Sequence, residues 1–279
     1  MIYMFIMKRF LFLTDFSSAS YNAFSYALEI ATLLHAKLYV LHVGDHVTLL
    51  NEDNVLNDYN SYKNIICDGL LENKSSEFYR RLSNSKFNSE NLFFYLSNGH
   101  LVPEIIQFTA LNKTDLIILG LRTKSQDMFK VLSTNTLNIL ASTTIPLLCV
   151  PDSVSFKTIR NLVFSTTLAS DEESALQHFI HYLQQLNATG TCLYVDNKTQ
   201  DFITTLNTWH KKYEYAPLAN VILKGNNAVQ LVINYLKLAY ADVIVTVKTN
   251  QTFFDQLFNA NFTKEMLDEI DIPLLILPK

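Results

Sequence analysis

The residue types best suited to holding an anionic ligand lie in short segments that directly follow apolar runs. Asp15 follows one such run, Val43 ends a second and Gly120 ends a third. Asp15 can accept hydrogen bonds from a base or a sugar, and a helix that begins near Ser133 offers backbone N–H groups and a positive dipole end to a phosphate. The sequence therefore predicts a ligand site, and its candidate residues are Thr14, Asp15, Val43, Gly120, Arg122, Thr123, Ser133 and Thr134.

Each of these residues also has a structural explanation that needs no ligand. Asp15 can shape the turn after its strand, and Ser133 or Thr134 can cap a helix. The nearby basic residues Arg122 and Lys124 can supply positive charge to a phosphate or can belong to an ordinary solvated loop. Residue types and spacing leave both explanations open.

The elements that would position these residues are strands and helices in alternation. Continuous apolar runs indicate strands that are covered on both faces, and apolar residues at helical spacing indicate the helices between them. Ligands of open parallel sheets bind beyond the carboxyl ends of the strands, where the strand order reverses. The predicted strands are 8–13, 37–43, 91–96, 115–120 and 145–150, with helices near 23–34, 68–82, 105–108 and 134–141 and a long surface segment at 44–66.

The second half of the chain repeats the plan of the first. From Asp115 to Ile145 is 30 positions, and from Asp242 to Ile272 is again 30, with similar apolar runs at both ends of each interval. An identical interval between similar runs indicates one supersecondary unit used twice. We therefore predict two domains, 1–152 and 158–279, joined by a short linker.

Two further features of the second half carry predictions. The sequence Ser170-Asp171-Glu172-Glu173 has the spacing of a capping box, in which Ser170 caps a helix and Glu173 reaches back. The aromatic residues Trp209, Tyr213 and Tyr215 are expected to form a packed helix end.

Composition excludes several classes of protein. Apolar residues make up 49% of the 279 positions and charged residues 17%, which argues against disorder. The formal net charge of −4 argues against a nucleic-acid partner, and no apolar run is long enough for a membrane span. The three cysteines have no metal-ligand spacing and are odd in number, so we expect a reducing, cytoplasmic location.

Several of these segments together resemble those of a known family. They are 13–17 (Leu-Thr-Asp-Phe-Ser), 41–43 (Leu-His-Val), 115–120 (Asp-Leu-Ile-Ile-Leu-Gly) and 145–151 (Ile-Pro-Leu-Leu-Cys-Val-Pro). The chain resembles the universal stress proteins in a tandem two-domain form. The resemblance implies an α/β fold of two tandem, doubly wound, parallel five-stranded sheets of the adenine nucleotide alpha hydrolase-like type, with strand order 3-2-1-4-5.

The resemblance also implies ATP or AMP as a ligand of the first domain, in a loop that departs from the family pattern. In the ATP-binding branch, strand four is followed by Gly, two residues, Gly, nine residues, and Gly with Ser or Thr. This chain has Gly120, then Thr123, then Ser133-Thr134, so only the first glycine is kept. Glycine allows positive φ and close approach of the backbone to phosphate, and Thr123 disfavours both.

The second domain departs further and is expected to bind no nucleotide. Thr166-Thr167 stands for Thr14-Asp15, Thr246 for Gly120, Thr249 for Thr123, and Asn259-Ala260 for Ser133-Thr134. The resemblance implies that the two domains pair through their last strands within the chain, and a homodimer is a further expectation.

Three functions stay open. The first is a non-enzymatic stress-response or signalling module that holds ATP or AMP in its first domain. The second is an interaction scaffold that binds no nucleotide, with an unknown protein partner. The third is a nucleotide-hydrolysing enzyme, which would need a metal-binding carboxylate or a general base near the phosphates.

Overall fold

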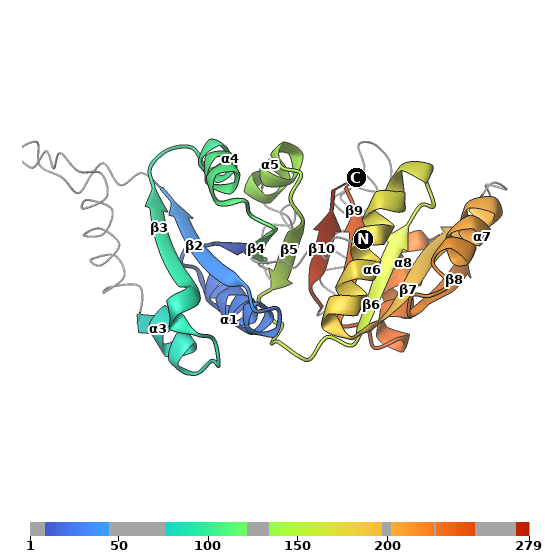
Figure 1. The fold of residues 1–279 in the computed structure, drawn as a ribbon, viewed down its shortest axis with the longest axis horizontal. Helices are drawn as coiled ribbons and strands as arrows, with labels where there is room; N and C mark the ends of the chain where they lie inside the picture. Colours follow the sequence, from blue (N-terminus) through green and yellow to red (C-terminus); the bar gives the residue numbers. More distant parts are fainter. Residues whose placement is uncertain are drawn as a thin grey trace, which may run out of the picture. The chain divides into compact units, whose positions relative to one another are not determined.

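The structure, a computed structural model, describes residues 9–44, 76–121, 134–196, 202–225, 227–248 and 272–278. Strands and helices alternate along these segments, as the sequence predicts (Figure 1). The chain divides into two compact units, one of residues 1–121 with 133–145 and one of residues 122–132 with 146–279.

The first unit contains four parallel strands in the order β3-β2-β1-β4. Strand β1 is almost entirely buried, because helices cover both faces of the strands: α1 and α3 on one, α4 and α5 on the other (Figure 1). The strands are β1 (Arg9–Leu13), β2 (Lys37–Val43), β3 (Leu92–Ser97) and β4 (Leu116–Leu121), and the helices are α1 (Ser18–Leu33), α3 (Ser76–Ser83), α4 (Leu101–Asn112) and α5 (Thr134–Ser142).

The second unit repeats this arrangement with strands β10-β9-β6-β7-β8 in parallel. Its remaining strand, β5, pairs antiparallel with β10, so that Leu148 lies opposite Leu275. The strands are β5 (Leu147–Pro151), β6 (Asn161–Thr166), β7 (Thr189–Asp196), β8 (Leu218–Lys224), β9 (Val243–Val247) and β10 (Leu274–Leu277), and the helices are α6 (Glu173–Leu186), α7 (Phe202–Lys212) and α8 (Ala228–Leu238).

The predicted fold class and strand order are confirmed. The order of the described strands is β3-β2-β1-β4-β5-β10-β9-β6-β7-β8, so it begins 3-2-1-4-5, and the last five strands read the same order backwards. One detail differs from the expectation of five strands in each half. Because β5 pairs with β10, it belongs to the second compact unit, whereas the predicted domain boundary places it in the first.

A pair of aspartates shows that the repeat is structural as well as sequential. The Asp115 carboxylate accepts a hydrogen bond from the backbone N–H of Arg9 at 3.0 Å, at the start of β1. The Asp242 carboxylate accepts from the N–H groups of Arg160 and Asn161 at 2.8 and 2.9 Å, at the start of β6. Both carboxylates therefore hold the first residue of a central strand in place.

One local prediction for the second half is wrong, and another is confirmed in part. The capping box does not form: residues Ser170–Glu172 make a 3-10 turn that Ala169 begins, and the Glu173 carboxylate instead accepts from Lys212 and Tyr213. The aromatic residues at the end of α7 pack in part: Trp209 and Tyr213 are buried, and the exposed Tyr215 has its ring 6.4 Å from that of Tyr213, measured between centroids.

Other predictions are confirmed, or fall outside the described residues. Gly99 and Gly225, which lie where a strand leads into a helix, have φ of 136° and 157°, in the left-handed half of φ space. Helix α3 overlaps the predicted 68–82 helix over residues 76–82 and ends one residue later. Residues 68–75 lie outside the described part. So does nearly all of the predicted surface segment at 44–66.

None of the helices in the described part of the chain is long and apolar enough to cross a membrane. Two of the three cysteines are described, and both are buried free thiols. Burial raises the pKa of Cys149. Burial, and to a smaller extent the negative charge of Glu172, raises the pKa of Cys192 to about 12. Neither thiol is therefore a nucleophile at neutral pH.

Candidate functional site

The turn after β1 is held by a network of short-range hydrogen bonds. The hydroxyl groups of Thr14 and Ser20 lie 2.7 Å apart, and the Phe16 N–H donates to the Thr14 hydroxyl at 3.0 Å. The Asp15 carboxylate accepts from the Ser17 N–H at 3.0 Å, and Ser17 in turn caps helix α1. Asp15 thus shapes the turn, as its structural explanation predicts, and it is exposed.

His42 ties the end of β2 to the same turn. Its Nδ1 lies 2.8 Å from the Thr14 carbonyl oxygen, and because that oxygen can only accept, Nδ1 carries the proton. The Thr14 N–H donates to the Leu41 carbonyl at 3.0 Å. Val43 follows at the carboxyl end of β2 and is half-buried. The structure therefore brings Thr14, Asp15 and Val43 to one edge of the sheet.

An aromatic cluster packs against the turn. Phe16 adopts a left-handed conformation with φ of 58°, which costs a non-glycine residue free energy. Its ring lies 4.6 Å from the His42 ring and 5.8 Å from that of Phe78 in α3, measured between centroids. These contacts hold Phe16, and with it the adjacent Asp15, in one conformation.

Gly120 lies level with Thr14, because Leu13 pairs with Leu119 in the neighbouring strand. A Cβ on Gly120 would lie 2.6 Å from the Ala19 carbonyl oxygen, closer than real Cβ atoms approach. The glycine therefore permits the first turn of α1 to pack closely against β4. This packing explains Gly120 without a ligand, and it does not prevent the backbone beyond it from meeting one.

The remaining candidate residues are placed only in part. The backbone of Thr134 begins helix α5, whereas Arg122, Thr123 and Ser133 lie outside the described residues, as does Lys124. What the structure describes is thus one side of the predicted site, with a carboxylate acceptor and a half-buried valine. Of the residues predicted to hold phosphate, only the backbone of Thr134 is described.

The corresponding turn of the second unit has the same backbone and different chemistry. Thr166 occupies the place of Thr14, and Leu168, with φ of 59°, that of Phe16. The Leu168 N–H donates to the Thr166 hydroxyl at 2.9 Å, as Phe16 does to Thr14. Thr167 replaces Asp15, so the exposed carboxylate of the first unit has no counterpart at this position.

The strand registers correct one predicted correspondence. Phe10 pairs with Leu116 in the first unit, and the matching Leu162 pairs with Val243 in the second. Counting on from these pairs, Gly120 corresponds to Val247, whereas Thr246 corresponds to Leu119. The expectation that Thr246 stands for Gly120 is therefore wrong by one residue, while the residues matched with Thr123, Ser133 and Thr134 lie outside the description.

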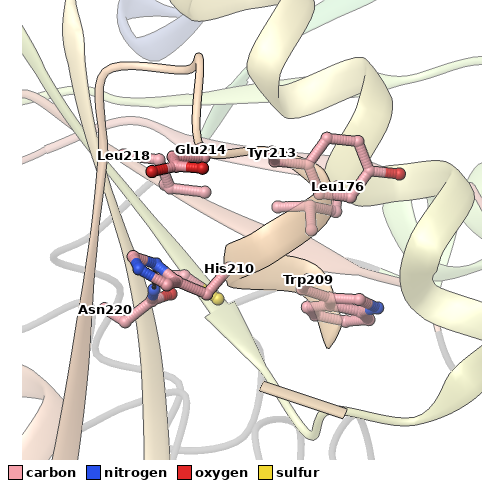
Figure 2. Close-up of a pocket in the computed structure, with 8 residues that line it drawn as sticks. Leu176, Trp209, His210, Tyr213, Glu214, Leu218 and Asn220 are labelled. Atoms are coloured by element: carbon pink, nitrogen blue, oxygen red, sulfur yellow. Dashed lines mark hydrogen bonds between the residues drawn. The ribbon is translucent and has the colours of Figure 1, made fainter. Parts of the chain in front are cut away.

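A small pocket lies elsewhere in the second unit, against helix α7 (Figure 2). Its volume is about 30 Å³, which is room for one or two water molecules. The His210 ring nitrogen Nδ1 and the Asn220 amide nitrogen lie 3.2 Å apart at its edge. The lining residues are Leu176, Cys192, Trp209, His210, Tyr213, Glu214, Leu218 and Asn220, and the pocket is too small for a nucleotide. Within the described residues, no group of three or more His, Cys, Asp and Glu side chains is arranged to hold a metal ion.

Comparison with known proteins agrees with this geometry. A model of the universal stress protein family matches residues 7–65, the segment that contains β1, α1 and β2. The resemblance to the universal stress proteins is confirmed. The matched segment includes the turn at Thr14 and Asp15 and the end of β2 at Val43. Among curated proteins, none has a matching sequence.

Solved structures share the fold of universal stress proteins across the whole chain. A universal stress protein from Archaeoglobus fulgidus DSM 4304 superposes with a TM-score of 0.72 at 15% identity, covering 98% of this chain and 99% of that one. A protein from Pseudomonas aeruginosa UCBPP-PA14, provisionally named a universal stress protein, gives 0.60 at 13% identity, with 99% and 94% covered. The cytoplasmic domain of a prokaryotic cation chloride cotransporter gives 0.52 at 11% identity, with 96% and 94% covered. At these identities the likeness is one of fold.

Sequence reasoning missed two features of the site. His42 was part of the family-like segment, and only a loop role was predicted for it; a histidine directly before Val43 was the available signal. Glu172 lies between Ser170 and Glu173 of the predicted capping box and had no role of its own, whereas its side chain turns toward the end of β6 and binds Thr166 and Thr167. The signal for Glu172 is its spacing: it follows Thr166 by six residues, as Ser20 follows Thr14.

Proposed function

We propose that this chain is a universal stress protein-like module for stress response or signalling, and that its first domain binds ATP or AMP. The observation that carries the proposal is the family match over residues 7–65, because that segment forms the turn with Asp15 and the strand end with Val43. The proposed domains are 1–152 and 158–279, with the nucleotide in the first domain only.

The residues of this chain divide between the two ends of the nucleotide. Asp15 accepts hydrogen bonds from the base or the ribose, and Val43 offers apolar surface to the base. Arg122, Thr123, Ser133 and Thr134 donate to the phosphates, with Gly120 and Thr14 setting the backbone between them. Positive side chains take the place of the loop glycines, since Arg and Lys donate to phosphate where the backbone cannot approach it.

The proposed module is not an enzyme, acts in the cytoplasm, and has neither a nucleic acid nor a membrane as partner. The pairing of β5 with β10 supports a pseudo-dimer in which two domains associate through their last strands. A homodimer and an unidentified protein partner belong to the same proposal.

Calorimetric titration of ATP and of AMP into the full chain tests the proposal. We expect wild-type protein to bind, and Asp15→Ala to weaken binding by at least about tenfold, since a hydrogen bond to a charged group contributes roughly 1.5–3 kcal/mol. Asp171→Ala, which removes an exposed carboxylate in the second unit, is the matched control and should leave affinity unchanged. Steady phosphate release that disappears in Asp15→Ala would contradict the non-enzymatic part.

An interaction scaffold without nucleotide is the second candidate. The packing of Gly120 against Ala19 favours it, because the one loop glycine that this chain keeps already has a structural use. Repeated absence of heat and of any thermal shift with ATP or AMP would support the scaffold over the nucleotide-binding module.

A further inference from the structure

The second unit has a buried carboxylate at the end of its first central strand. Glu172 is 1% exposed. Its Oε2 accepts from the Thr166 hydroxyl and, at 3.0 Å, from the Thr167 N–H, while Oε1 accepts from the Thr167 hydroxyl at 2.6 Å. A buried charge is stable only where donors compensate it, and three donors converge here on one carboxylate.

The first unit shows what this position looks like without the carboxylate. Adding 152 to a residue number in the turn after β1 gives its counterpart, so Thr14 becomes Thr166 and Ser20 becomes Glu172. Where Thr166 meets the Glu172 carboxylate, the Thr14 hydroxyl meets the small hydroxyl of Ser20, at 2.7 Å. The acidic residue of the first turn, Asp15, is exposed, whereas that of the second points inward.

A difference in the neighbouring strand accounts for the inward carboxylate. Gly120 allows the first turn of α1 to approach β4, but Val247 fills the corresponding place in β9. In the second unit the chain makes a 3-10 turn at Ser170–Glu172, and α6 begins at Glu173. By the same offset α1 would begin at 170, so α6 starts three residues later, and Glu172 is the last residue before it.

We propose that the turn at residues 166–168 is a cradle for a small carboxylate-type anion, and that Glu172 is its built-in occupant. The donors that could meet an anionic ligand at this edge of the second unit are already bound by a negative group. If the first domain binds nucleotide as proposed above, Glu172 restricts nucleotide binding to that domain. The cradle itself does not depend on that function.

The cradle is tested by removing the Glu172 carboxylate and supplying a free carboxylate in solution. In the full-length chain, Glu172→Ala leaves the hydroxyls of Thr166 and Thr167 and the Thr167 N–H without their acceptor, so we expect the melting temperature to fall by roughly 5 °C. Sodium formate should then raise it with a saturating dependence on concentration, because formate binds only the folded variant. Sodium chloride at equal ionic strength should not.

Matched variants separate this result from a general salt effect. Asp171→Ala removes an exposed carboxylate next in sequence to Glu172 and should show no difference between formate and chloride, as should the wild type. Glu172→Gln keeps the cradle filled and should not respond to formate. Should Glu172→Ala fail to fold, Glu172→Ser copies the Thr14–Ser20 pair while leaving the Thr167 donors open, and the same formate response is expected.

Equal responses to formate and chloride in Glu172→Ala and Glu172→Ser would overturn the proposal. ATP binding is measured separately, by titrating ATP into the wild type and into Glu172→Ser. Wild type that binds no ATP would remove the proposed function and leave the formate result standing. A chain that binds ATP but shows no formate-specific stabilisation would remove the cradle alone.

Discussion

Replacing Phe78 by alanine is expected to lower the free energy of unfolding by about 3–5 kcal/mol, the range for loss of a fully buried phenylalanine. Phe78 is 1% exposed, and it is the side chain of α3 that enters the core of the first unit. Rings within 6.5 Å of its own, centroid to centroid, are those of Phe12, Phe16, Tyr21, Phe24 and Phe94. Urea denaturation followed by circular dichroism measures the change.

The loss of Phe78 should also reach the candidate site. Phe16 is held in its left-handed conformation partly by the Phe78 ring, so its release frees the adjacent Asp15. Tyr79→Ala is the control, because Tyr79 lies next in the same helix and is 50% exposed. We expect that variant to lose less than about 1 kcal/mol. Equal losses in the two variants would contradict the assignment of Phe78 to the core.

Replacing Gly120 by valine, the residue found at the matching place in β9, should destabilise the chain by about 3 kcal/mol, the upper part of the usual range for overpacking. The obstacle is the Ala19 carbonyl, which is backbone and cannot rotate away, so α1 itself would have to shift. Gly120→Ala should show a smaller loss in the same direction. Thermal and urea unfolding of Gly120→Ala and Gly120→Val measure the loss of stability in each.

A control for Gly120→Val is available in the second unit. Thr246 is buried, and its hydroxyl has no hydrogen-bond partner among the described residues. Thr246→Val therefore exchanges one β-branched side chain for another of similar size in a central strand, without loss of a hydrogen bond among the described residues, and should be neutral or slightly stabilising. Full stability of Gly120→Val would show that close packing of α1 on β4 is not what requires the glycine.

The fold could be predicted from the sequence because its signals are local and occur twice. Buried parallel strands appear as continuous apolar runs, and the equal intervals from Asp115 and Asp242 mark two copies of one unit. The similar runs that end each copy, in β5 and β10, were expected to pair, and they do so as antiparallel strands. The grouping of β5 with the second unit depends on this pairing between residues about 125 positions apart. No local sequence pattern shows such a long-range pairing.

The site was predictable only where a strand end fixes it. Thr14, Asp15 and Val43 come together because parallel strands β1 and β2 end at the same edge. The use of Gly120 in helix packing depends on the distance to Ala19, which spacing does not contain. Glu172 was misread because the spacing of Ser170 and Glu173 satisfies the capping-box pattern, while the burial of a carboxylate against Thr166 and Thr167 is a tertiary effect.

Native mass spectrometry of the full-length chain with added ATP or AMP tests the central claim most directly, since it counts bound nucleotides. The account predicts one nucleotide per chain in the wild type and none in Asp15→Ala at the same concentration. Two nucleotides per chain would contradict the proposal that the second domain binds none. No nucleotide bound to the wild type would contradict nucleotide binding by the first domain.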